Sequence, residues 1–303
     1  MTWLSDAVVG RLREVATWPE LTSDRYEIRR PVGRGGMGTV YAAYDTVLER
    51  EVAIKVSNAL VPDDGLEERL RLEARVLARL EHPGIVPVHD AGVLDDGRLY
   101  YVMKLVHGET LAARAPALTT EADRLSVFLR IAETVAFAHD SGVVHRDLQP
   151  ANVMVGRFGE VLVLDWGVAR LVDLIESPGI RVGTPGFMAP ELQRGDSATA
   201  EPAADIFALG ALLNWILGDA AVPRRLRAIT NKCAQPDTRD RYSNAADLVA
   251  DLSRYRAGLP VSAHRDTLAE RAGLWFAKYQ TLVFLIAAYL LMRALFAFFQ
   301  RTP

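Results

Sequence analysis

The sequence has only one cysteine, Cys233, among 303 residues, and it carries little excess of charge of either sign. A single cysteine excludes an intramolecular disulfide and fits a reducing cytosolic setting. The formal net charge of -3 gives no sign of a nucleic-acid-binding protein, which would usually be basic. Hydrophobic residues at 50% and charged residues at 24% instead indicate a globular chain, long enough for one large or two smaller domains.

The first 24 residues lack the uninterrupted apolar core of a signal peptide, because charged side chains such as Asp6, Arg11 and Glu14 interrupt it. Apolar residues at helical spacing predict a short accessory helix in residues 1–24, which Pro19 would end. We assign no chemistry to this segment.

A glycine-rich stretch over residues 33–38 lies between two runs with strand character, residues 26–32 and 39–41. Glycines at this spacing let backbone N–H groups approach phosphate oxygens closely. The same spacing occurs in dinucleotide-binding folds, where the third glycine opens a helix. Here the strand pattern continues, so we predict a glycine flap between two strands.

Lys55 lies within the apolar strand pattern of residues 52–56. Such a lysine either reaches water from a sheet edge or pairs with an anion, and the nearby glycine flap favours the anion. Residues 66–80 have the pattern of a helix, and Glu73 falls on its apolar stripe, where a carboxylate is costly without a cation. We therefore predict an ion pair between Lys55 and Glu73; the alternative places Glu73 at the edge of the stripe, in water.

Two further strands are predicted at residues 85–88 and 99–105. The second ends in Met103-Lys104-Leu105, a hinge where an adenine could meet backbone groups. Helical patterns dominate from Thr110 onward, with a long example over residues 122–139. The order predicts an α+β fold with a small strand-rich lobe, a larger helical lobe and a cleft between them.

Three oxygen-bearing side chains, Asp147, Asn152 and Asp165, lie at the ends of short apolar strands within residues 143–167. Such a set suits the orientation of a hydroxyl group and the binding of magnesium against phosphates. The alternative is two unrelated turns, because Asp and Asn favour turns in any case.

Together these motifs resemble the bacterial Hanks-type, or eukaryotic-like, serine/threonine protein kinases over about residues 26–255. The resemblance rests on a series in the right order: the glycine loop at 33–40, Val52-Ala53-Ile54-Lys55, Glu73, His145-Arg146-Asp147, Asn152, Asp165-Trp166-Gly167, Ala189-Pro190-Glu191, Asp205 and Arg241. It implies a bilobal kinase domain over residues 25–256, with the N-lobe at about 25–106 and the C-lobe at about 107–256.

The resemblance also implies an activity, the transfer of the ATP γ-phosphoryl group to hydroxyls of protein substrates. Lys55, held by Glu73, would bind the α- and β-phosphates, and Asp147 would accept or orient the substrate hydroxyl. Asn152 and Asp165 would bind Mg²⁺. The implied ATP contacts are Val32, Gly33, Arg34, Gly35, Gly36, Met37, Gly38, Thr39, Val40, Ala53, Lys55, Met103 and Leu105.

Three more residues receive structural roles from the same resemblance. Glu191 and Arg241 would form a partly buried ion pair that braces the helical lobe, and Asp205 would anchor the catalytic loop. Arg146 would suit a phosphate on the segment after Gly167, for which Ser177 and Thr184 are the candidate acceptors.

Two departures from the family pattern favour alternatives to an active protein kinase. Gln149 replaces a lysine that would supply a point charge near the γ-phosphate, so we expect Gln149→Lys to raise kcat. Only residues 219–223 separate two helical patterns between which the family usually inserts another helix. The main alternative is a catalytically weak pseudokinase or nucleotide-binding membrane scaffold, and a further one is a small-molecule kinase of similar fold.

After a mixed, charged linker at 257–278, residues 279–299 are almost wholly apolar. Twenty-one helical residues span roughly 31 Å, so we predict a transmembrane helix there. Arg293 opposes this prediction, because an arginine in mid-membrane costs about 2.5–3.5 kcal/mol. The uninterrupted apolar run, residues 282–292, could also form a buried or interfacial helix.

Basic residues flank this segment unequally: Arg265, Arg271 and Lys278 precede it, and only Arg301 follows. The bias predicts a single-pass membrane protein with its kinase domain in the cytoplasm. Residues 300–303 are too short for an external sensor, so we expect regulatory input from cytosolic partners, from the membrane or from formation of a homodimer.

Overall fold

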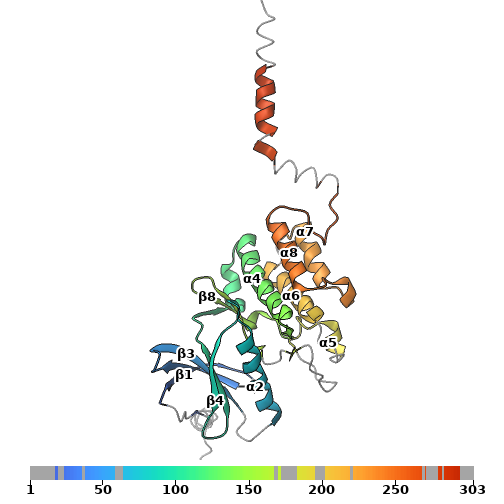
Figure 1. Cartoon of the computed structure of the whole chain (residues 1–303). Coiled ribbons are helices and arrows are strands. Elements are labelled where there is room, and N and C mark those ends of the chain that lie inside the picture. The colour runs from blue at the N-terminus through green and yellow to red at the C-terminus, as the bar shows by residue number, and fades with distance from the viewer. Residues whose placement is uncertain are drawn as a thin grey trace, which may run out of the picture.

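The computed structural model describes residues 18–19, 24–35, 38–58, 64–166, 170–171, 183–194, 202–218, 221–267, 270, 279–281 and 283–293 (Figure 1). The strands are β1 Tyr26–Arg34, β2 Gly38–Asp45, β3 Arg50–Ser57, β4 Val88–Val93, β5 Leu99–Lys104, β6 Gly108–Thr110, β7 Val143–Val144, β8 Val153–Gly156, β9 Val161–Val163 and β10 Arg170–Leu171. The α-helices are α2 Asp64–Arg79, α3 Leu111–Arg114, α4 Glu121–Asp140, α5 Pro190–Arg194, α6 Pro202–Leu217, α7 Arg224–Cys233 and α8 Ala245–Arg256. Short 3-10 turns are η1 Ala115–Ala117, η2 Pro150–Asn152 and η4 Thr238–Asp240.

The N-lobe is an antiparallel sheet of five strands in the order β1-β2-β3-β5-β4. β3 lies at its centre, which explains why its middle residues are buried on both faces of the sheet. Helix α2 lies beside β3, β4 and β5 and buries Leu70 and Leu77 (Figure 1). The sheet and helix give the small strand-rich lobe that the sequence predicted.

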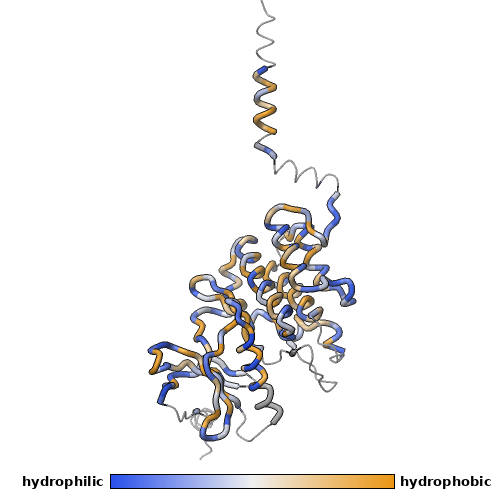
Figure 2. The backbone as a smooth tube through the Cα atoms, viewed as in Figure 1, coloured by the Kyte–Doolittle hydropathy of each residue, from blue (hydrophilic) through white to orange (hydrophobic). Residues whose placement is uncertain are grey.

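The C-lobe is helical, with α4 packed against α6 and α8, and α7 against α6 and α8 (Figure 1). Helix α4 begins at a capping box in which the Thr120 hydroxyl accepts from the Asp123 amide and the Asp123 carboxylate accepts from the Thr120 amide. Helix α6 is buried on nearly all sides, so its position is fixed by the core around it. Apolar residues concentrate between these helices, and polar residues follow the outer loops (Figure 2).

One hydrophobic core joins the two lobes. It runs from Leu77 of α2 through Leu148 and Trp166 to Leu248 of α8. A second, smaller core lies within the N-lobe sheet around Ile54. The segments that carry the predicted catalytic residues therefore lie against the shared core and have a fixed support.

The predicted strand at residues 85–88 is wrong except at Val88. The strand in this part of the chain is β4, Val88–Val93. The Ile85 amide donates to the His82 carbonyl in a turn, and Ile85 forms only a single bridge, to Val163. Ile85 and Val86 are buried between the lobes. Their apolar character reflects this burial and not strand pairing.

Of the predicted accessory helix in residues 1–24, only Trp18, Pro19 and Asp24 belong to the described residues. Trp18 packs edge-on against Tyr41, with 5.5 Å between the ring centroids.

The described start of the predicted linker at 257–278 is attached to the C-lobe. The buried carboxylate of Asp251 accepts hydrogen bonds from the amides of Ser262 and Ala263. Asp266 forms an ion pair with Arg225 of α7 at 2.7 Å. Residues 262–266 thus extend the packed lobe beyond α8.

The C-terminal segment is helical at 279–281 and 283–293 and lies apart from the two lobes (Figure 1). Its large apolar side chains are mostly exposed, at Phe284, Leu285, Ile286, Tyr289, Leu290, Leu291 and Met292. Within the described residues, we find no helix with both the length and the apolar character needed to cross a bilayer. Residues 282 and 294–299 of the predicted span lie outside the described part of the chain.

An ion pair between Arg241 and Glu191 braces the C-lobe, as predicted. The Arg241 guanidinium donates to both Glu191 carboxylate oxygens, at 2.7 and 2.8 Å, and to the Ala203 and Gln235 carbonyls. The Arg241 side chain is fully buried, whereas that of Glu191 is 19% exposed.

We predict that Arg241→Ala lowers the free energy of unfolding by about 3 kcal/mol, because it leaves a carboxylate and several carbonyls without their donor. The value lies at the low end for a buried pair because water reaches part of Glu191. Arg239→Ala is the matched control: this exposed arginine pairs with Asp237 on the surface, and its loss should cost far less than the loss of Arg241. Denaturant unfolding measures both, and equal losses would contradict the bracing role.

Candidate active site

The catalytic loop is fixed by the buried carboxylate of Asp205 on α6. Its oxygens accept the His145 and Arg146 backbone amides at 2.7 and 2.8 Å, and His139 Nε2 lies 2.9 Å away. Burial opposes the ionised form, but the hydrogen bonds and the charge of His139 outweigh it and hold the pKa of Asp205 below its usual value. This anchor keeps Arg146 in the left-handed region, at φ 70°.

Asp147, the predicted base, is oriented by three side chains. Asn152 Nδ2 donates to its carbonyl at 2.9 Å and to its carboxylate at 3.0 Å. Gln149 Nε2 donates to the same carboxylate oxygen at 3.1 Å, and the Thr184 hydroxyl donates to the other at 2.8 Å. The carboxylate therefore has one defined orientation and already binds a hydroxyl group at one oxygen.

The predicted ion pair between Lys55 and Glu73 is present. Lys55 Nζ lies 2.8 Å from both Glu73 carboxylate oxygens and 3.3 Å from Asp165 Oδ1. Both members of the pair are buried. Burial alone would lower the pKa of Lys55, but the two carboxylates outweigh it and raise that pKa. Lys55 is thus a cation that faces Asp165 at the cleft.

The glycine loop lies next to this cation, because Val40 of β2 pairs directly with Lys55 of β3. Gly38 is required by close packing: a Cβ there would lie 2.5 Å from the Val56 carbonyl oxygen. Asn58 supports the loop, since its side chain donates to the Gly35 carbonyl and accepts from the Thr39 hydroxyl. Gly36 and Met37 lie outside the described residues.

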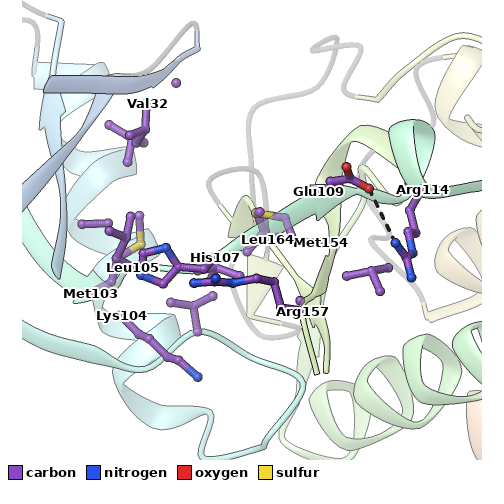
Figure 3. A pocket seen from close by; sticks show the side chains of 18 of the residues that line it. Val32, Met103, Lys104, Leu105, His107, Glu109, Arg114, Met154, Arg157 and Leu164 are labelled. Atoms are coloured by element: carbon purple, nitrogen blue, oxygen red, sulfur yellow. Dashed lines mark ion pairs between the residues drawn. The ribbon is translucent and has the colours of Figure 1, made fainter. Parts of the chain in front are cut away.

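Two adjoining cavities, of about 870 and 310 Å³, form the cleft between the lobes and share Met103 and Leu164 in their walls. The larger lies at the hinge, with Val32 on one side and Met154 and Leu164 on the other (Figure 3). The predicted nucleotide contacts in its wall are Val32, Gly33, Val40, Ala53, Met103 and Leu105. The smaller adds Arg34, Gly35, Gly38 and Lys55, next to Glu73 and Asp165.

Thr39 lines neither cavity, because its side chain is buried and directed to Asn58. Five apolar residues in the wall of the larger cavity were not predicted: Val86, Val106, Met154, Val155 and Leu164. Two of them could have been found from the alternation of side chains along the β8–β9 hairpin, which places Met154 and Leu164 on one face. These walls offer apolar surface suited to a flat heterocyclic ring.

Asn152 and Asp165 have a donor set that fits magnesium. The Leu164 amide donates to the Asn152 carbonyl at 2.8 Å, so the segments that carry the two side chains lie side by side. Both hydrogen bonds of the Asn152 side chain use its nitrogen, which leaves the amide oxygen as a ligand. The Asp165 side chain is 51% exposed. Two protein oxygens completed by phosphates and water are typical of magnesium sites.

Trp166 helps to fix the backbone conformation of Asp165. Its indole N–H donates to the Val163 carbonyl at 3.2 Å, and its ring meets His145 edge-on at 4.7 Å between centroids. His145 Nε2 in turn lies 2.9 Å from the Leu164 carbonyl. These contacts hold Asp165 at a φ of 60°, a strained value for a residue other than glycine.

Comparison with known proteins finds the protein kinase domain over residues 26–251. Serine/threonine-protein kinase PknD of Protochlamydia amoebophila is 32% identical over 304 residues, covering 78% of this chain and 30% of that protein. Serine/threonine-protein kinase PknB of Mycobacterium tuberculosis is 33% identical over 297 residues, covering 85% of this chain and 47% of that protein. The chain thus spans less than half the length of these relatives. On its domain match and these similarities, the chain belongs to the protein kinase family, within its bacterial Hanks-type serine/threonine branch.

Proposed function

We propose that this chain is a serine/threonine protein kinase that transfers the γ-phosphoryl group of ATP to hydroxyls of protein substrates. The observation that carries the proposal is that Lys55 and Asp165 line one cavity, while Asn152 joins Asp147 to the segment that carries Asp165. Phosphoryl transfer depends mainly on positioning and electrostatic stabilisation, which this arrangement supplies.

Each group has a role that follows from its surroundings. The Lys55 ammonium and the loop amides bind the α- and β-phosphates. Asp147 orients the attacking hydroxyl and receives its proton. Asn152 and Asp165 hold Mg²⁺, which when bound would neutralise charge that develops on the transferred group.

Two observations favour serine and threonine as acceptors. The Thr184 hydroxyl, at the Gly183-Thr184-Pro185 turn, already reaches the Asp147 carboxylate, so a short aliphatic hydroxyl fits that position. The relatives PknD and PknB are named as serine/threonine-protein kinases. We assign no individual protein substrate.

A second candidate function, a nucleotide-binding scaffold with weak activity, is favoured by Gln149. This side chain supplies an amide to Asp147 where the family usually has a cation near the γ-phosphate. The direct passage from α6, ending at Leu217, to α7, beginning at Arg224, also removes a helix that serves substrate docking in the family.

We further propose that the C-terminal helix attaches the kinase domain to a membrane, with that domain on the cytoplasmic side. The support is the exposed apolar surface of residues 283–293 and the basic residues that precede them. The described helix has 11 residues in its longer part, about 16 Å, so on its own it reaches halfway through the hydrocarbon core.

The main prediction concerns Asp147→Asn in the full chain. We expect phosphoryl transfer from labelled ATP to a panel of proteins to fall by about 100-fold or more, because an amide cannot accept the hydroxyl proton. Chelation of magnesium should abolish transfer, while Asp140→Asn, at the exposed end of α4, should leave the rate unchanged. Labelling that survives Asp147→Asn would contradict the assignment, and nucleotide binding without transfer in wild type would select the scaffold.

Gln149→Lys tests the effect of the missing charge. We expect kcat to rise about three- to tenfold, because a lysine ammonium near the γ-phosphate would stabilise the transferred phosphoryl group by roughly 1 kcal/mol. Gln149→Met, which has similar length but no charge or donor, should lower kcat. Steady-state kinetics on purified protein gives both values, and an unchanged kcat in Gln149→Lys would rule out the charge as the limiting factor.

Membrane attachment is tested by paired substitutions on the C-terminal helix. Ile286→Asp with Leu290→Asp should lower binding to phospholipid vesicles by about tenfold or more, because charged side chains are costly in the apolar region. Val47→Asp with Leu48→Asp, at an equally exposed turn of the N-lobe, is the control and should bind like wild type. Vesicle flotation measures the bound fraction; equal binding by all three proteins would argue against attachment by this helix.

A further inference from the structure

Four helix termini meet at one end of the C-lobe. The end of α8 is joined to the start of α4, because the Tyr255 hydroxyl donates to the Glu121 carboxylate at 2.8 Å. The end of α6 is joined to α4 as well, since the Arg124 guanidinium donates to the Leu217 carbonyl at 2.6 Å. Only residues 218–223 separate the end of α6 from the start of α7. We call this region, which lies on the side of the C-lobe away from the N-lobe sheet (Figure 1), the distal end; it comprises residues 121–124, 217, 224–227 and 254–266.

Exposed arginines gather at the distal end. Arg224 and Arg227 lie three residues apart at the start of α7, so they share one face of that helix. Arg254 and Arg256 lie in the last turn of α8, and Arg265 lies on the segment that an ion pair holds against α7. The Arg224 side chain is 84% exposed and that of Arg254 is 51% exposed. Their guanidinium groups are therefore available to a partner in solution.

Most of the negative charge at the distal end is turned inward. The side chains of Asp251 and Asp266 are almost completely buried, and Asp266 is paired with α7. The Glu270 carboxylate accepts a hydrogen bond from an amide three residues before it, at 2.8 Å. Glu121 and Asp123, in the first turn of α4, are exposed, but each already accepts a hydrogen bond within the lobe. The outward-facing charge is thus mainly positive.

A leucine is exposed among these arginines. Helix α8 ends in a Schellman turn, in which the Leu259 amide donates to the Arg254 carbonyl at 2.8 Å and Gly258 has a φ of 67°. In such a turn the residue at the Leu259 position usually packs on an apolar residue at the position that Arg254 occupies here. Arginine offers a poorer apolar surface, and Leu259 is left 45% exposed. The turn therefore presents an apolar side chain and arginines together to solvent.

The distal end is connected to the apolar C-terminal helix by a short piece of chain. Glu270 lies 4.0 Å from Arg224 of α7, and the helical segment begins nine residues later, at Tyr279. Nine residues span at most about 32 Å even when fully extended. With the C-terminal helix at a membrane, the distal end is confined to this distance from the lipid. Confinement of this kind raises the effective concentration of the two surfaces and favours a second contact between them.

Anionic phospholipid headgroups are the partner whose chemistry fits this surface. Guanidinium groups match phosphate with two parallel hydrogen bonds. Negatively charged lipids attract basic residues that lie close to a membrane segment. An apolar side chain among the arginines suits the boundary between headgroups and acyl chains. A nucleic acid would use the arginines but would leave Leu259 without a partner.

We propose that the distal end of the C-lobe is a second membrane contact, in which its arginines bind anionic phospholipid headgroups and Leu259 reaches the interface. This inference rests on the proposed membrane attachment by the C-terminal helix. The contact orients the kinase domain, because the cleft lies between the two lobes and the distal end lies away from the N-lobe (Figure 1). The cleft then faces away from the bilayer, toward soluble proteins.

The test is Arg227→Gln with Arg256→Gln in the full chain, measured by flotation with two kinds of vesicle. One is phosphatidylcholine alone, and the other contains about one-third phosphatidylserine. We expect the binding constant for the phosphatidylserine vesicles to fall about tenfold, because each arginine near an anionic surface strengthens binding several-fold. Binding to phosphatidylcholine should stay within about twofold of wild type, since that surface has no net charge.

Arg75→Gln with Arg79→Gln is the matched control, because it removes two exposed arginines from one helix of the N-lobe and changes the net charge equally. It should bind both kinds of vesicle like wild type. An equal loss in the control pair, or a loss below twofold in the distal pair, would overturn the proposal. In the second case the preference for phosphatidylserine would come from residues outside the distal end, such as Arg271 and Lys278.

Leu259→Ser separates a membrane from a soluble polyanion. It should lower binding to the phosphatidylserine vesicles about threefold, because an apolar side chain is lost from the interface. Binding of Leu259→Ser to these vesicles equal to that of wild type would overturn the proposed insertion. Binding to a short double-stranded DNA as tight as binding to the vesicles, and weakened in the distal arginine pair, would assign the surface to nucleic acid and overturn the proposal.

The helix substitutions Ile286→Asp with Leu290→Asp distinguish this inference from the proposed attachment. If they leave binding to phosphatidylcholine unchanged, attachment by the helix fails, and the effect of the distal pair on phosphatidylserine vesicles still decides the present proposal. If they abolish binding to phosphatidylcholine and wild type shows no preference for phosphatidylserine, the helix attaches the protein and only the distal contact fails. If wild type binds neither kind of vesicle, both proposals fail.

Discussion

The position of the catalytic loop depends on one buried carboxylate, that of Asp205. Two consecutive backbone amides of the loop and the His139 ring point at its oxygens. Without this acceptor the two amides would be buried and unpaired, and the left-handed conformation of Arg146 would lose its main restraint. Because α6 is packed on nearly all sides, the anchor transfers the rigidity of the C-lobe core directly to Asp147.

From this anchor a continuous series of contacts leads into the N-lobe. His145 contacts the Leu164 carbonyl and the Trp166 ring, which set the backbone on both sides of Asp165. Asp165 contacts Lys55, and through it the series reaches Glu73 on α2. A movement of α2 away from the sheet would break the contact with Lys55 before any contact within the C-lobe. The Lys55–Glu73 pair is therefore the contact that ties the position of α2 to the cleft.

The Lys55–Glu73 pair could be predicted from periodicity because a charged residue within an apolar stripe is costly unless it has a partner. Val86 and Val106 in the apolar wall of the cleft could not be predicted, since they look like any other core residues in sequence. Strand β4 was misplaced for the same reason: burial between lobes and burial within a sheet leave the same apolar pattern.

Gln149 supplies an amide donor to Asp147 at a position where the family usually has a lysine. Its amide donates to the carboxylate oxygen of Asp147 that also accepts from Asn152, so it contributes orientation where a lysine would contribute charge. In a loose phosphoryl-transfer transition state the attacking hydroxyl needs alignment more than early removal of its proton, and alignment is retained here. Under the proposed kinase function, a lysine would also stabilise the charge on the transferred group, which an amide cannot do. The missing charge is therefore one of the two features that separate the proposed kinase from a scaffold, and the proposed kinase would rely on magnesium and Lys55 for stabilisation of charge.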